Sequence, residues 1–211
     1  MFSSTQARSS ARRSRAAVIS VAVGAAVMVT AVVGFLGDQQ SAASVVSATP
    51  EAPAPPPQEA GPGADGSVPD GVTVFDGDIP AVANLHADLL AALRQAATAA
   101  ADDGITFVVT SGWRSAAYQD QLLSDAVAEY GSAAEAARWV ATADTSPHVQ
   151  GAAIDVGPWA AMTWLSEHGT AYGLCQVYAN EPWHYELRPD AVDAGCPAQY
   201  ADPTDDPRMQ P

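Results

Sequence analysis

The segment SPHVQGAAID, residues 146–155, contains a histidine and an aspartate whose side chains can meet. His148 and Asp155 are seven positions apart, which is too far for one face of a helix. A turn at Gly151 would bring a histidine on a loop beside an aspartate on a strand. Taken alone, such a pair is typical of a structural hydrogen bond, so a chemical site requires further groups from elsewhere in the chain.

The segment EPWHYE, which begins at Glu181, supplies those groups. His184 adds a second imidazole, and two histidines with one carboxylate suit a zinc ion that keeps a fourth position open for water. Glu181 lies three residues earlier, and a carboxylate near that water can take its proton in a hydrolytic reaction. On an extended strand, His184 and Glu186 share one face, whereas Trp183 and Tyr185 point the other way into packing. The two segments together predict a hydrolytic metal site.

The other two histidines lack ligand spacing. His86 stands beside Asp88 in a predicted helix, where we expect it to be solvated. His168 precedes Gly169 at a predicted helix end, where a donor suits the last carbonyl groups. We therefore assign structural positions to both.

The elements that must position these residues follow from hydrophobic spacing and turn residues. Val82, Leu85, Leu89 and Leu93 have helical spacing, within a predicted helix that runs from 78 to 104. Helices lead and strands gather late, which predicts an α+β fold with a small, mainly antiparallel sheet flanked by helices. The later predicted elements are a strand at 105–110, a turn at 111–114, helices at 115–130 and from 132, a strand at 152–156, a helix at 158–169, and two strands at 174–178 and 183–187.

The N-terminal part of the chain has a different composition. Residues 16–36 form an uncharged stretch of 21 residues, about the length that a helix needs to cross a bilayer, and four arginines precede it. This charge asymmetry predicts a cytoplasmic N-terminus and an exported domain. A signal peptide cleaved near Ala48 is the alternative. The predicted organisation is a cytoplasmic basic tail (1–15), a transmembrane anchor (16–36), a disordered linker rich in Pro, Gly and Ala (37–71), a folded domain (72–205) and a short tail (206–211).

Charge and cysteine content restrict the function further. Beyond residue 36, 24 acidic residues face five arginines and no lysine, a net charge near −19. Such a surface repels phosphates, so the chain is not expected to bind nucleic acid. Cys175 and Cys196 can close one disulfide in an oxidising compartment. A zinc site made by these cysteines is disfavoured, because they lack the paired spacing of thiolate sites.

Three motifs, taken in order, resemble the signatures of VanY-type D-alanyl-D-alanine carboxypeptidases. They are SGWRS at 111–115, SPHVQGAAID at 146–155 and EPWHYE at 181–186. The likeness extends through YQDQLL, AEYG, YGLC and ADPTDDPRM, and so over nearly the whole predicted domain. This family belongs to a wider group that includes D-Ala-D-Ala dipeptidases and the hedgehog-like zinc domain. The resemblance implies the fold of that group and one zinc ion per domain.

The resemblance also implies roles for individual residues. His148, Asp155 and His184 would be the zinc ligands, and Glu181 would be the general base. Arg114 would polarise the scissile carbonyl and stabilise its developing negative charge. The alternative for Arg114 is a surface salt bridge, which a turn after a buried strand disfavours.

Further implied roles concern the substrate and the metal surroundings. Gln119 and Ser146 would hold the C-terminal end of the substrate, although Ser146 can also serve as a turn cap. Glu186 would orient a metal ligand from behind, or else be solvated. Two residues depart from the usual pattern: Trp113 stands where many relatives have tyrosine, and Pro147 separates the serine from the metal histidine.

By this resemblance, the chain is a zinc D-Ala-D-Ala carboxypeptidase that removes the terminal D-alanine from peptidoglycan stem peptides. It would be held in the bacterial cell membrane with its domain outside, or be secreted to the cell wall if the signal is cleaved. One alternative is another peptidoglycan peptidase, either a D,D-dipeptidase or an L-alanyl-D-glutamate endopeptidase. A second alternative is a tethered wall-binding module without catalysis, which would usually have lost the base or the arginine.

Overall fold

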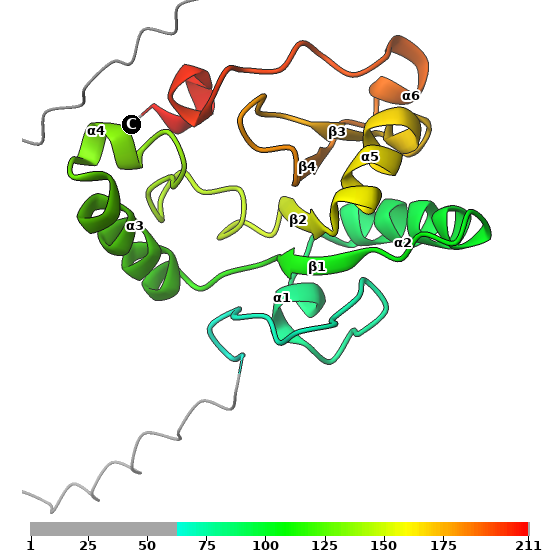
Figure 1. Cartoon of the computed structure of the whole chain (residues 1–211), viewed down its shortest axis with the longest axis horizontal. Helices are drawn as coiled ribbons and strands as arrows, with labels where there is room; N and C mark the ends of the chain where they lie inside the picture. Colours follow the sequence, from blue (N-terminus) through cyan, green and yellow to red (C-terminus); the bar gives the residue numbers. More distant parts are fainter. Residues whose placement is uncertain (1–62, 211) are drawn as a thin grey trace, which may run out of the picture. The chain divides into compact units, whose positions relative to one another are not determined.

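A four-stranded antiparallel sheet organises residues 63–210, the part of the chain that the computed structural model describes (Figure 1). The strand order is β1-β2-β4-β3, so the two central strands come from distant parts of the sequence. The strands are β1 (Val108–Ser111), β2 (Ala153–Gly157), β3 (Leu174–Gln176) and β4 (His184–Leu187). The predicted α+β class with a small antiparallel sheet is confirmed.

The basic tail, the predicted membrane span and most of the predicted linker lie outside the described residues. Among the described helices, none is long and apolar enough to span a bilayer. The anchor therefore stays a prediction.

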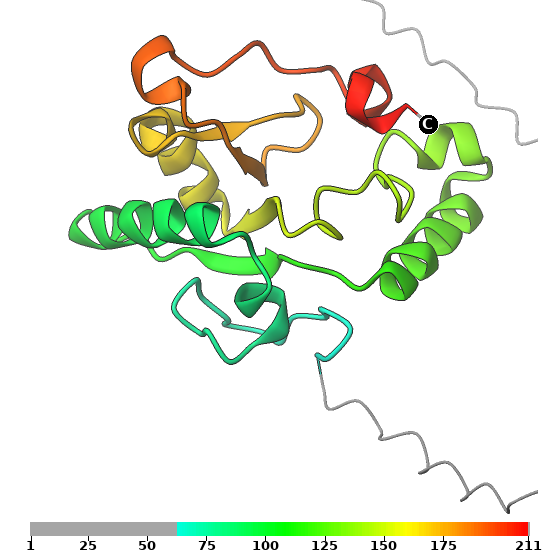
Figure 2. The ribbon, with the colours of Figure 1, turned by 180° about the vertical axis from the view of Figure 1, so that it is seen from behind.

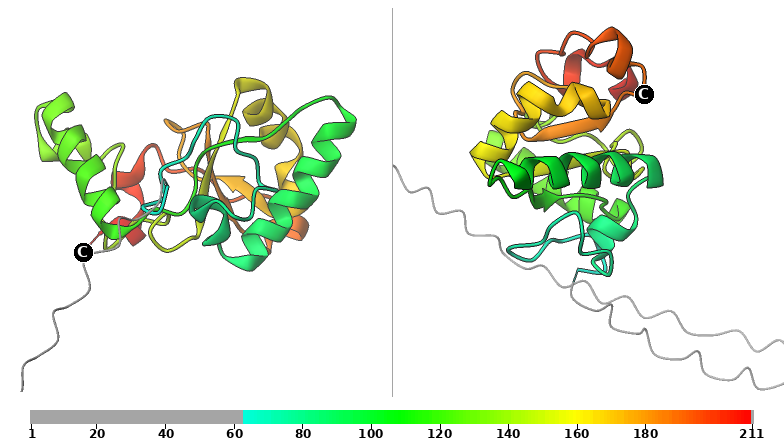
Figure 3. Two further views of the ribbon diagram at one scale, coloured as in Figure 1. Left: turned by 90° about the horizontal axis from the view of Figure 1, so that it is seen from below. Right: turned by 90° about the vertical axis from the view of Figure 1, so that its right-hand side faces the viewer.

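Helices α2 (Ala87–Asp102) and α5 (Trp159–His168) pack against one face of the sheet and against each other, and Figure 3 shows both helices next to the strands. Ile154 and Val156 of β2 point into this core, so Asp155 between them must point to the opposite face. The sheet thus separates an apolar core from a polar face. A 3₁₀ turn, η1 (Gly169–Tyr172), continues α5, and α6 (Ala191–Ala194) follows β4.

The predicted continuous helix over 78–104 is wrong, because the chain breaks after α1 (Pro80–Ala83) and restarts with α2. The backbone N–H of His86 donates to the carbonyl of Gly151 at 2.8 Å instead of continuing a helix. Gly151 has a positive φ, and a Cβ placed there would lie 2.4 Å from the carbonyl oxygen of Asn84. The residues at this break therefore contact the loop that leads into β2 and hold it in place.

Helices α3 (Ala116–Tyr130) and α4 (Ala133–Ala136) pack together at the other end of the domain (Figure 1). Their starts agree with the predicted caps, since the side chains of Ser115 and Ser132 accept backbone N–H groups of the first turns. Gly131 caps the C-terminal end of α3 in the left-handed conformation, with a φ of 80° that glycine adopts more easily than other residues. The loops before α3 and after α4 supply residues of the polar face.

The folded unit extends beyond the predicted limits of 72 and 205. At its start, the N–H of Ser115 donates to the carbonyl of Asp65 at 2.8 Å. At its end, Asp206 is fully buried, so the predicted tail belongs to the fold. Two 3₁₀ turns complete the chain, η2 (Pro203–Asp205) and η3 (Pro207–Met209). The predicted disulfide between Cys175 and Cys196 is present, with their Cα atoms 5.7 Å apart.

Candidate functional site

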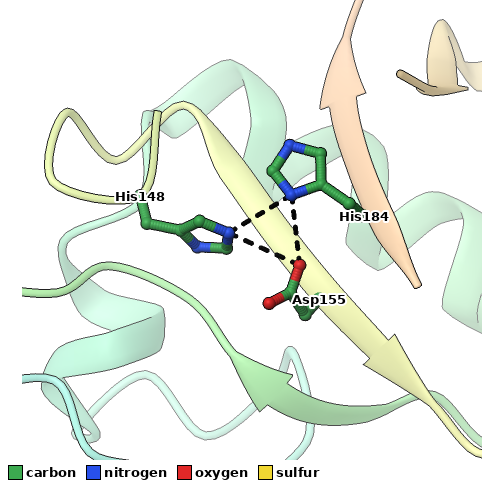
Figure 4. Close-up of side chains that lie close together, drawn as sticks. All are labelled: His148, Asp155 and His184. Carbon is green, nitrogen blue, oxygen red and sulfur yellow. Dashed lines mark hydrogen bonds and ion pairs between the residues drawn. The ribbon is translucent and has the colours of Figure 1, made fainter. Parts of the chain in front are cut away.

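Three side chains converge on the polar face of the sheet (Figure 4). Asp155 on β2 and His184 on β4 are directly paired in the strand register, so their side chains leave the sheet side by side. His148 comes from the loop before β2, which the turn at Gly151 folds back over the strand. The first two segments of the sequence analysis therefore meet at one point.

The three inward atoms form a nearly equilateral triangle. His148 Nε2 lies 3.3 Å from His184 Nδ1 and 3.4 Å from Asp155 Oδ1, and the latter two atoms are 3.2 Å apart. A tetrahedral zinc with bonds of about 2.0–2.1 Å would hold its ligand atoms about 3.3–3.4 Å apart. Both the donor set and the spacing therefore fit zinc.

The outer nitrogen of each histidine is held by a second contact. His148 Nδ1 lies 2.8 Å from the carbonyl oxygen of Gly112, which can only accept, so Nδ1 carries the proton and Nε2 is free to bind a metal. His184 Nε2 faces Glu186 Oε1 at 3.4 Å, which leaves Nδ1 pointing inward. Glu186 is 1% exposed and therefore is not a solvated carboxylate.

The electrostatics favour the metal-binding forms of two of the three side chains. Burial lowers the pKa of His148 and keeps its imidazole neutral. Burial disfavours the ionised form of Asp155, but His148 and His184 outweigh it and hold the pKa of this carboxyl well below its usual range. For His184, burial is outweighed by hydrogen bonds to Asp155 and Glu186, which raise its pKa to about 9. Metal binding at neutral pH should therefore displace a proton from His184.

Glu181 is the buried carboxylate beside this triangle. Its Oε2 lies 3.7 Å from His184 Nδ1, and its Oε1 is buried without a hydrogen-bond partner among the described residues. Burial raises the pKa of Glu181 to about 7, even though the charge of His184 opposes the shift. A carboxylate with this pKa can take up and return a proton near neutral pH.

Arg114 is fixed by three hydrogen bonds rather than placed in a surface salt bridge. Its guanidinium donates to Ser111 Oγ at 2.7 Å, Gln119 Oε1 at 3.1 Å and Asp155 Oδ2 at 3.2 Å. Asp155 thus offers one oxygen to the arginine and the other to the two histidines. The result is a rigid positive charge next to the triangle.

The structure also brings Gln119 and Ser146 to the site. Both are 1% exposed and both line the cavity next to the triangle. Gln119 uses its oxygen for Arg114 and its amide nitrogen for the carbonyl of Ala141 at 2.9 Å. Both of its polar groups are therefore engaged within the protein, which favours a positioning role over direct substrate binding.

The cavity has a volume of about 420 Å³ and opens between the polar face of the sheet and helix α3. Tyr130 and Trp139 stack on its outer wall, with ring centroids 6.0 Å apart. Trp183 also lines it, in contrast to the predicted packing of this residue into the core. Tyr185 does lie in the core, as predicted.

The sequence analysis missed residues behind His184. Tyr178 lies with its ring centroid 5.0 Å from that of His184, and Arg208 pairs with Glu186. The signal for Arg208 was the stretch ADPTDDPRM, which resembles the family and contains this arginine, but it did not indicate a contact with Glu186. His86 lies outside the site and is exposed, as expected. His168 ends α5 with its Nδ1 3.0 Å from the carbonyl oxygen of Trp164, which confirms its predicted structural position.

Comparison with known proteins agrees with the three motifs. The family model described as VanY, D-alanyl-D-alanine carboxypeptidase, matches residues 82–190, more than half of the chain. A D-alanyl-D-alanine carboxypeptidase of Enterococcus faecalis is 32% identical over 112 residues, which are 41% of this chain and 42% of that protein. The chain therefore spans less than half the length of this curated relative.

Two solved structures are also similar. VanYB in complex with D-alanine-D-alanine has 27% sequence identity and a TM-score of 0.48, over 53% of this chain and 74% of that chain. A variant of the D,D-pentapeptidase VanY from a VanB-type vancomycin resistance cassette, in complex with Zn(II), has 27% identity and a TM-score of 0.48, over 53% and 75%. On the strength of the family match across residues 82–190, the chain belongs to the VanY family of D-alanyl-D-alanine carboxypeptidases.

Proposed function

We propose that the chain is a zinc-dependent carboxypeptidase that removes the terminal D-alanine from peptidoglycan stem peptides ending in D-Ala-D-Ala. The observation that carries this proposal is the triangle of His148, Asp155 and His184, with inward atoms 3.2–3.4 Å apart and, beside it, a buried carboxylate oxygen that has no hydrogen-bond partner within residues 63–210. Three protein ligands leave one zinc position open, which is the arrangement of catalytic rather than structural zinc.

When bound, zinc supplies a lowered pKa for its water and a positive charge that polarises the substrate carbonyl. Glu181 takes the proton of the attacking water, because its carboxylate is buried next to His184 and has a pKa near 7. It then returns this proton to the nitrogen of the departing D-alanine. One carboxylate thus serves as base and then as acid.

Arg114 stabilises the negative charge that develops on the scissile carbonyl oxygen. Its three hydrogen bonds hold the guanidinium in place before the substrate arrives, so little reorganisation is needed during the reaction. Ser146 lines the same cavity, which supports the proposal that it contacts the C-terminal carboxylate of the substrate.

The cavity favours a stem peptide over the alternatives. It continues from the triangle along α3 to Tyr130 and Trp139, which leaves room for residues upstream of the bond that is cut. A free D,D-dipeptide would not use that room. A wall-binding module without catalysis would have no need of both Glu181 and Arg114.

We further propose that the domain acts outside the membrane. The disulfide between Cys175 and Cys196 suits an oxidising compartment, and a wall polymer is found there. Residues 16–36 would anchor the chain in the membrane, with release to the wall if cleavage occurs near Ala48.

The test is the product released by the zinc-loaded full chain. A pentapeptide stem ending in D-Ala-D-Ala, the matched peptide ending in D-Ala-L-Ala, and free D-Ala-D-Ala would be compared by quantifying D-alanine and the remaining peptide. We expect equal amounts of D-alanine and tetrapeptide from the first substrate and far slower turnover of the other two. Cleavage of the free dipeptide alone would indicate a dipeptidase, and binding without cleavage would indicate a wall-binding module.

A further inference from the structure

Residues 206–210 contact the two side chains that lie behind the candidate ligand His184, namely Glu186 and Tyr178, although they lie beyond the residues that the family model matches. We call residues 206–210 the C-terminal segment; it is red in Figures 1 and 2 and lies beside α4. The segment reaches His184 by two routes, one through a carboxylate and one through an aromatic ring.

The first route passes through Glu186. Arg208 binds both oxygens of this carboxylate, with Nη1 at 2.7 Å from Oε2 and Nη2 at 3.1 Å from Oε1. Glu186 Oε1 in turn lies 3.4 Å from Nε2 of His184. A two-point contact fixes the plane of the carboxylate, and the carboxylate then fixes the ring.

The second route passes through Asp206 and Tyr178. Asp206 is fully buried and accepts hydrogen bonds from Nε of Arg208 at 3.0 Å and from the hydroxyl of Tyr178 at 3.0 Å. The ring of Tyr178 lies against His184, with centroids 5.0 Å apart. The C-terminal segment therefore restrains both the edge and the face of the imidazole.

Arg188 also touches Glu186, but at a single oxygen, with Nη1 at 2.9 Å from Oε2. This second arginine means that loss of Arg208 would not leave the buried carboxylate without a positive partner. Asp206 would keep two donors, the hydroxyl of Tyr178 and the backbone N–H at position 208. Loss of the Arg208 side chain should therefore release the orientation of Glu186 rather than unfold the domain. The other metal histidine differs, because His148 is oriented by a backbone carbonyl that no side-chain substitution removes.

We propose that Arg208 is a positioning residue that acts through Glu186 to aim Nδ1 of His184 at the metal. This inference rests on the metal centre of the proposed function. It assigns the C-terminal segment to the metal site, although the sequence analysis predicted this segment to be a tail.

The test is zinc affinity, measured on the full chain by competition with a chromophoric chelator. Removing a direct partner of a metal-bound histidine usually lowers affinity about 10- to 100-fold, and Arg208→Gln should give a loss near the lower end of that range, about 10-fold, because it acts through Glu186. Arg208→Lys keeps the charge without the two-point geometry and should give a smaller loss. Arg138→Gln is the matched control, because Arg138 pairs with Asp202 and Glu135 and does not touch Glu186.

A thermodynamic cycle with Glu186→Gln separates positioning from a general structural effect. If Arg208 acts mainly through Glu186, Arg208→Gln should cost several-fold less zinc affinity in the Glu186→Gln background than in the parent, and the remaining loss measures the route through Asp206 and Tyr178. Unchanged affinity in a folded Arg208→Gln variant, or equal losses in both backgrounds, would overturn the proposal. If Arg208→Gln fails to fold in the absence of metal, Arg208→Lys decides in its place, and parental affinity in that variant would overturn the proposal. The proposed function fails in a different way, namely if the parent binds zinc no more tightly than His184→Ala.

Discussion

Replacing Gln119 by leucine would show whether this side chain holds Arg114 or holds the substrate. Leucine has a similar volume and removes both polar groups from a position that is 1% exposed. The substitution deletes the hydrogen bond from Arg114 at 3.1 Å and the bond to the carbonyl of Ala141 at 2.9 Å. Arg114 would keep two of its three anchors, to Ser111 and Asp155.

The magnitude follows from those two hydrogen bonds. A buried group left without a partner costs about 1–3 kcal/mol, so the loss of both bonds should lower the free energy of unfolding by about 2–6 kcal/mol. A hydrogen bond to a charged group is worth about 1.5–3 kcal/mol, and about 1.4 kcal/mol corresponds to a tenfold change in rate. If that bond serves to align the guanidinium with the transition state, kcat should fall by about 10- to 100-fold, whereas KM should change little.

The assay measures D-alanine release from the pentapeptide stem at several substrate concentrations, together with urea unfolding of the same variant. Gln119→Glu is a useful second variant. It keeps an oxygen that accepts from Arg114, but it removes the N–H that donates to the carbonyl of Ala141. A large rise in KM with an unchanged kcat would refute the positioning role. It would support the direct contact with the substrate that the family resemblance implies.

Three further outcomes are expected. Replacing Cys175 and Cys196 together by alanine should lower the free energy of unfolding, measured by urea denaturation, by about 3 kcal/mol for a loop of this size. A change below about 1 kcal/mol would show that the disulfide does not stabilise the domain by restricting the unfolded chain. Trp139→Ala should raise KM for the pentapeptide several-fold with little effect on kcat, and equal KM values would argue against the outer wall as a substrate contact. Burial raises the pKa of Glu186, but His184 and Arg208 prevail and lower it to about 2, so metal-free protein should lose stability as the pH falls from about 4.5 towards 2. This part of the pH dependence should be missing from Glu186→Gln.

Strand alternation predicted that His184 and Glu186 share one face, and their contact in the structure confirms this. In the structure the same period turns Asp155 away from Ile154 and Val156. The turn at Gly151 was likewise readable from the residue type. These features depend on neighbours a few positions apart, and such neighbours leave a periodic signal in the sequence.

Contacts between distant segments left no comparable signal. The helix predicted over 78–104 breaks because His86 donates to Gly151, a partner 65 positions away that no helical periodicity reveals. The C-terminal segment carries one proline and two charged residues, which is typical of a tail, yet Arg208 lies beside Glu186. The role of Gln119 depends on the carbonyl of Ala141, which likewise lies far along the chain.

The most direct test of the central claim compares the parent with Glu181→Gln, both as full chains with zinc affinity measured. The glutamine keeps the size of the side chain and leaves the three metal ligands intact, but it cannot accept the proton of the attacking water. We expect the zinc affinity of Glu181→Gln to lie within a few-fold of the parent, and its rate of D-alanine release to fall by about 10²- to 10⁴-fold. Parental turnover in the zinc-loaded Glu181→Gln variant would contradict the account.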